Sequence, residues 1–120
     1  MARGDEARVQ AVFEEWLVAR GWSLRGVAER GHVDVDAVHR DGRRLLAEVK
    51  GATAATGTDV DTAYGQLLRR MTDEERTSYA VVVPEGVATT AARRVPDRVR
   101  RTLGIALYSV TSEGAVHGPV

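Results

Sequence analysis

Three of the four carboxylates between residues 32 and 51, together with the one lysine there, form a pattern that could bind a metal ion. The carboxylates belong to Asp34, Asp36 and Glu48, and the lysine is Lys50. Apolar neighbours mark this stretch as largely buried, and a buried carboxylate is costly unless it is paired or bound to a metal. Two ionised carboxylates about 4 Å apart repel by roughly 4 kcal/mol at an effective dielectric of about 20. Lys50 offsets part of this repulsion, and a hard divalent cation with oxygen ligands offsets the rest.

Lys50 is also the only lysine in the chain, and the other permanently basic side chains are all arginines. A compact ammonium and a planar guanidinium are not interchangeable, so a single lysine favours a specific role for it. The alternatives are chance, and a surface hairpin whose polar face carries an ordinary ion pair of little energetic value.

A predicted hairpin positions these groups. An Asp-Gly pair accepts the positive φ angles of hairpin turns, so residues 41 and 42 predict a tight turn between two strands. Side chains alternate between the faces of a strand, so Glu48 and Lys50 share one face, and Asp34 and Asp36 share a face of the other strand. Pairing across the turn can therefore bring an aspartate beside the glutamate and the lysine. A register shift of one residue would upset this assignment.

The order Asp36, hairpin, Glu48-Val49-Lys50 resembles the Asp…Glu-x-Lys signature of the PD-(D/E)XK nuclease superfamily, nearest to its small Holliday-junction-resolvase-like members. The resemblance implies a restriction-endonuclease-like fold and a metal-dependent DNA phosphodiesterase, either an endonuclease or an exonuclease. It assigns Mg²⁺ or Mn²⁺ to Asp36, Glu48 and the Val49 carbonyl, oxygen ligands that suit octahedral coordination. It assigns to Lys50 the orientation or activation of the attacking water.

The resemblance also ranks the two aspartates. In relatives the metal-binding aspartate lies a few residues before the turn, displaced along the hairpin from the glutamate, which makes Asp36 the first choice. Asp34 stands where many relatives carry a secondary acid, so it remains an additional candidate. The chain departs from many relatives because no proline precedes the aspartate.

Two predicted helices, residues 5–20 and 59–71, add further candidates. Both segments have apolar residues at three- and four-residue spacing, which is typical of a helix with one buried face. Relatives often carry a glutamate that faces the metal on the first helix, and a glutamine or tyrosine near the active site on the second. The corresponding residues here are Gln10 and Glu14, then Gln66 and Tyr64. For each of them the alternative is an ordinary position on a helix.

The remaining segments complete an α/β pattern. Residues 22–29 predict a strand, and the apolar run 78–83 predicts a strand buried on both faces. A helix over 88–103 is interrupted by Pro96, and a strand over 105–110 precedes a turn and tail. The order α-β-β-β-α-β-α-β predicts one domain over residues 1–120, a mixed sheet flanked by helices. The resemblance identifies this order with the restriction-endonuclease-like core.

Composition limits the possible partners. The formal net charge is zero, so contact with DNA must rest on local arginine clusters, although such clusters are often solvated helix faces. The absence of cysteine and of a long apolar run predicts a cytoplasmic protein with no membrane contact. A small nuclease could gain surface as a homodimer. The alternative function is a non-catalytic module on the nuclease fold that binds nucleic acid or a protein partner. The candidate DNA-binding residues are Arg69, Arg70, Arg93 and Arg94.

Overall fold

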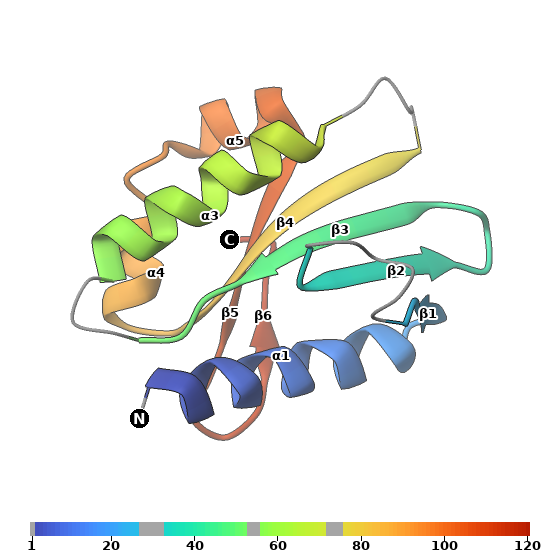
Figure 1. Cartoon of the computed structure of the whole chain (residues 1–120), viewed down its shortest axis with the longest axis horizontal. Coiled ribbons are helices and arrows are strands. Elements are labelled where there is room, and N and C mark those ends of the chain that lie inside the picture. Colours follow the sequence, from blue (N-terminus) through green and yellow to red (C-terminus); the bar gives the residue numbers. More distant parts are fainter. Residues whose placement is uncertain (1, 27–32, 53–55, 72–75) are drawn as a thin grey trace.

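A mixed β-sheet forms the centre of the computed structural model, which describes residues 2–26, 33–52, 56–71 and 76–120, with side chains from Asp5 onwards (Figure 1). Within these residues the sheet has six strands, and β3, β4 and β5 are parallel while the outer pairings are antiparallel. In spatial order the strands are β1 (Trp22–Leu24), β2 (Val35–His39), β3 (Arg44–Val49), β4 (Thr77–Pro84), β5 (Ile105–Val110) and β6 (Val116–His117).

Helices cover both faces of the sheet (Figure 1). The long helix α1 (Ala2–Val18) packs on one face, where Val9, Phe13 and Leu17 are buried at four-residue spacing. The other face is covered by α3 (Thr56–Arg70), which connects β3 to β4, and by the helices between β4 and β5. These two are α4 (Val87–Ala92) and α5 (Asp97–Leu103).

The hairpin between β2 and β3 has a three-residue loop, one residue longer than the tight Asp-Gly turn expected from the sequence. The His39 N–H donates to the Arg43 carbonyl at 2.8 Å, which leaves residues 40–42 as the loop. Gly42 has a φ of 95°, the left-handed conformation that glycine adopts at little cost. This loop pairs Asp36 with Leu46 and Val35 with Ala47. The register therefore differs by one residue from that of a two-residue turn.

Most predicted elements are confirmed, with changes at their ends. The first helix begins at Ala2, the second begins at Thr56, and the predicted break at Pro96 separates α4 from α5. The short strand β6 was not expected in the tail. The strand predicted over 22–29 ends at Leu24 in β1, and residues 27–29 lie outside the described residues. Leu68, an apolar residue of the helix predicted over 59–71, is 45% exposed rather than buried.

None of the helices in the described parts of the chain is long and apolar enough to cross a membrane. The α/β class and the mixed sheet agree with the sequence prediction. The parallel strands β3 and β4 end side by side, and the loops that follow them leave from the same edge. Side chains at this edge can therefore come together from the hairpin, from α3 and from α1.

Candidate active site at the carboxyl end of β3

Glu48 lies near the end of β3, opposite Asp34. The register that pairs Val35 with Ala47 places Asp34 across from Glu48 when it is continued by one residue. Asp34 also accepts a hydrogen bond from the Val49 N–H at 2.8 Å, which holds its carboxylate at the end of the ladder. The structure therefore brings Glu48 beside Asp34, the additional candidate, rather than beside Asp36, the first choice from the sequence.

The carboxyl group of Glu48 is buried and incompletely paired. The residue is 2% exposed, and its Oε1 atom has no hydrogen-bond partner. Burial raises the pKa of Glu48 to about 8, and the hydrogen bond and negative charge of Asp34 act in the same direction. The positive charges of Arg70 and Lys50 lower this pKa but do not cancel the other effects. Glu48 consequently keeps a proton at neutral pH unless a cation takes its place.

Two cations face this pair from different elements. Lys50 follows β3 and is close enough to Glu48 to lower its pKa. Arg70, in the last turn of α3, places its Nε 4.0 Å from the Glu48 carboxylate, and this buried Nε has no hydrogen-bond partner. Arg70, one of the four arginines expected to contact DNA, is thus directed towards the Glu48 carboxyl group. Arg70 therefore approaches Glu48 without forming a hydrogen bond to it.

Gln66 lies one helical turn before Arg70 on α3, so the two side chains project from the same side of the helix. The helix runs back over the sheet in the direction opposite to β3 (Figure 1). The Oε1 atom of Gln66 is buried and has no hydrogen-bond partner. Three polar atoms without partners therefore come from two elements that pack together, β3 and α3, and they belong to Glu48, Gln66 and Arg70.

Asp36 has a different environment. Its side chain is fully buried, and the Arg44 guanidinium donates to both carboxylate oxygens, at 3.1 and 2.8 Å. The Nε of Arg25 lies 3.5 Å from the same carboxylate. The structure therefore places the preferred metal ligand of the sequence prediction between two arginines.

The helical candidates occupy supporting positions. Gln10 donates to the Asp34 carbonyl at 3.0 Å and to Glu14 at 3.3 Å, so it fastens α1 to the start of β2. Tyr64 donates its hydroxyl to the Ala92 carbonyl at 2.7 Å, which ties α3 to α4. Gln10 thus contacts the backbone of a candidate ligand, whereas the Tyr64 hydroxyl is directed towards α4.

The four arginines expected to bind DNA do not form one cluster. Arg70 faces Glu48, while Arg69 and Arg93 are exposed. Arg94 lies 3.6 Å from Asp61, and its guanidinium donates to the Gly57 carbonyl. A role for these arginines in DNA binding remains a prediction.

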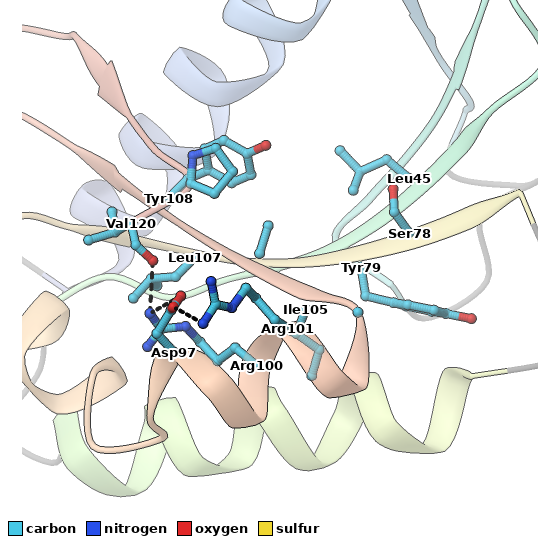
Figure 2. A pocket seen from close by; sticks show the side chains of 13 residues that line it. Leu45, Ser78, Tyr79, Asp97, Arg100, Arg101, Ile105, Leu107, Tyr108 and Val120 are labelled. Atoms are coloured by element: carbon cyan, nitrogen blue, oxygen red, sulfur yellow. Dashed lines mark hydrogen bonds and ion pairs between the residues drawn. The ribbon is translucent and has the colours of Figure 1, made fainter.

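A cavity of about 570 Å³ lies at the opposite end of the sheet, beside α5 and the amino ends of β3, β4 and β5. Figure 2 shows Arg100 and Arg101 close to Asp97 in this cavity. The buried Arg100 donates to the Val95 and Val120 carbonyls at 2.7 and 2.8 Å, so it stabilises the packing of α5. We therefore place the candidate site at the carboxylate pair rather than in this cavity.

The donor set limits which metal could bind. Among the described residues, no three or more His, Cys, Asp or Glu side chains are grouped to hold a metal ion. Mg²⁺ usually keeps several waters and is bound by only one or two carboxylates, which Asp34 and Glu48 can supply. The unpartnered oxygen of Glu48 fits such an ion, as does the unfavourable proximity of the two acids.

Comparisons with known proteins do not identify a family. No protein-family model matches the chain, and no curated protein or solved structure is significantly similar to it.

Sequence reasoning missed the two arginines at Asp36 and the approach of Arg70 to Glu48. Arg44 is the first residue of β3, and the opposite charges of Arg44 and Asp36 on facing strands were the available signal. The approach of Arg70 depends on how α3 lies over β3, which no local pattern reveals. Asp5 was also missed, although it accepts a hydrogen bond from the Ala52 N–H at 2.7 Å and so fastens α1 to the segment after Lys50.

Proposed function

We propose that this chain is a metal-dependent DNA phosphodiesterase with a restriction-endonuclease-like core. The observation that carries the proposal is Glu48, a strand carboxylate that is 2% exposed and has an oxygen without a hydrogen-bond partner. A structural carboxylate in such a position would be expected to have its partners. A carboxylate that lacks one, beside a second acid and a lysine, is suited to a divalent cation.

Glu48 and Asp34 are the residues that would hold Mg²⁺ or Mn²⁺, with the Val49 carbonyl as a further oxygen ligand. When bound, the cation stabilises negative charge on the phosphate and lowers the pKa of a coordinated water. This assignment differs from the sequence prediction because Asp34, rather than Asp36, lies opposite Glu48. The use of two carboxylates also agrees with the absence of any larger ligand group among the described residues.

Lys50 and the polar groups of α3 would act on the substrate. The compact ammonium of Lys50 can stabilise charge on the scissile phosphate or hold the attacking water by a hydrogen bond. The amide of Gln66 can hold a phosphate oxygen or a water, since the amide is a donor and an acceptor and its buried oxygen lacks a partner. Arg70 would help to place the phosphate next to the two acids.

The test is cleavage of plasmid, single-stranded and branched DNA in the presence of Mg²⁺ or Mn²⁺. Lys50→Ala should reduce the rate by at least about a hundredfold, within the range that a positioned proton-transfer or electrostatic group supplies. Lys50→Arg should also be impaired, because a planar guanidinium cannot occupy the place of a compact ammonium. Glu15→Ala, an exposed change on α1, serves as the control and should leave the rate unchanged.

Two outcomes would contradict the proposal. Equal rates for the wild type and Lys50→Ala would assign any cleavage to a contaminant or to another site. No cleavage of any of the three substrates by the wild type would favour the non-catalytic module that binds nucleic acid or a protein partner.

A further inference from the structure

Asp36 is the centre of a second charged cluster, which the proposed reaction does not use. Arg44 donates to both of its carboxylate oxygens, at 3.1 and 2.8 Å. Arg25 approaches the same carboxylate with its Nε at 3.5 Å, and its backbone N–H donates to the Asp36 carbonyl at 2.8 Å. One carboxylate therefore contacts two guanidinium groups.

The two arginines remain accessible although the carboxylate is not. The Asp36 side chain is 0% exposed, whereas those of Arg25 and Arg44 are 38% and 33% exposed. The buried Nε of Arg25 has no hydrogen-bond partner. The cluster thus has a buried carboxylate and two guanidinium-bearing side chains that are about one third exposed, so part of each arginine can reach a ligand in solvent.

The position of the cluster indicates which anion. Asp36 lies in β2, two residues after Asp34, which immediately precedes this strand, so in an extended chain the two side chains share a face about 7 Å apart. A polyanion that places one phosphate at Asp34 and Glu48 would extend its next charged group over this cluster. Guanidinium groups bind phosphate through paired N–H donors, and a carboxylate behind them fixes their orientation.

We propose that Arg25 and Arg44, held by Asp36, bind the DNA phosphate adjacent to the one at Asp34 and Glu48. This inference rests on the proposed function, because it takes the substrate to be DNA. It makes Asp36 a positioning residue that acts through the two arginines, rather than a metal ligand.

The test measures DNA binding in EDTA, where neither the metal nor cleavage contributes. A fluorescently labelled single-stranded or duplex oligonucleotide is titrated with the wild type and with Arg25→Gln at several salt concentrations. The variant should bind about tenfold more weakly, as expected for a lost charge-assisted contact. Its plot of log affinity against log salt should also be less steep, by about 0.9 for duplex DNA. Arg98→Gln removes an exposed arginine on α5 and is the matched control, with no expected change.

A second variant separates phosphate binding from a structural role. Arg25→Lys keeps the charge but loses the paired donors, so it should keep the salt dependence of the wild type while binding more weakly. Asp36→Asn should weaken DNA binding and leave Mn²⁺ binding unchanged. Unchanged DNA binding by folded Arg25→Gln would overturn the inference, and loss of Mn²⁺ binding by Asp36→Asn would make Asp36 a metal ligand instead.

The outcomes for the two proposals are separable. Cleavage by a protein whose DNA binding does not depend on Arg25 would overturn this inference alone. Binding that depends on Arg25 in a wild type that cuts no DNA would overturn the proposed activity alone. A wild type that binds no DNA in EDTA at low salt would overturn the inference whatever the cleavage assay shows.

Discussion

Two buried carboxylates on the same face of the β2–β3 hairpin, Asp36 and Glu48, have opposite surroundings. The Asp36 side chain is 0% exposed and has Arg44 on both oxygens. Glu48 is nearly as buried, with a side chain 3% exposed, but its closest cation is 4.0 Å away and one of its oxygens has no hydrogen-bond partner. The strands, the face and the chemical group are shared, so the difference lies in the partners.

The charge of Asp36 is thus compensated by arginines of the protein, whereas a negative charge on Glu48 would be compensated only in part. Asp36 is paired within the protein, and its pairing can order two arginines. Burial of Glu48, together with the hydrogen bond and the negative charge of Asp34, raises its pKa to about 8, and Arg70 and Lys50 offset this only in part. A folded protein that retains such a group requires a proton or a metal ion at that position. The proposed metal site is one way to meet this requirement.

The largest expected effect on stability is that of replacing Asp36. Asp36→Ala leaves two guanidinium groups against a buried position without their counter-ion, so the free energy of unfolding should fall by about 3 kcal/mol. Urea denaturation followed by circular dichroism measures this loss. Asp61→Ala is the control, because the ion pair of Asp61 with Arg94 is exposed and should contribute less than about 1 kcal/mol. Equal losses of unfolding free energy in the two variants would show that the buried ion pairs of Asp36 contribute no more to stability than an exposed ion pair.

Replacing Glu48 should instead raise the free energy of unfolding, and the size of this gain should depend on pH. The pKa of Glu48 is raised by folding, so the folded state binds the extra proton and the wild type loses stability as the pH rises from about 4.5 to about 8. Glu48→Gln mimics the protonated form and removes this loss. In EDTA, its free energy of unfolding should equal that of the wild type near pH 4 and exceed it near pH 9, with the difference growing between about pH 4.5 and about pH 8. A difference that does not change with pH would show that the Glu48 carboxyl titrates normally.

The elements of the fold were more predictable than the contacts of the site. The spacing of Val9, Phe13 and Leu17 predicted α1, the apolar run predicted β4, and Pro96 predicted the break between α4 and α5. These features depend on local periodicity or on one backbone constraint, both of which the sequence carries.

The identity of the acid beside Glu48 was not predictable, because it depends on one residue of loop length. A two-residue turn would pair Asp36 with Ala47, whereas the three-residue loop pairs Asp36 with Leu46 and sets Asp34 opposite Glu48. An Asp-Gly sequence is compatible with both loops, and a shift of one residue moves side chains to the other face. The approach of Arg70 to Glu48 depends in the same way on tertiary packing. The sequence therefore predicted a candidate site within the hairpin but did not determine which side chains pair there.

The smallest expected effect on stability is that of a change at Tyr64. This change also distinguishes Tyr64 from Gln66, the other candidate site residue on α3. Tyr64→Phe removes the hydrogen bond to the Ala92 carbonyl and should lower the free energy of unfolding by about 1 kcal/mol. It should leave the cleavage rate unchanged, whereas Gln66→Ala should reduce the rate with little loss of stability. Thermal denaturation and the plasmid assay measure the two properties. Loss of activity in Tyr64→Phe without loss of stability would give its hydroxyl a role in the site.

The most direct test of the account is isothermal titration calorimetry with Mn²⁺ at about pH 7. The wild type should bind the ion and release about one proton, because the metal replaces the proton that Glu48 holds below a pKa of about 8. Buffers of different ionisation enthalpy reveal this proton, Glu48→Gln should not bind, and Glu15→Gln should behave as the wild type. Absence of binding in the wild type, or equal binding by Glu48→Gln, would contradict the assignment of a metal site to Asp34 and Glu48.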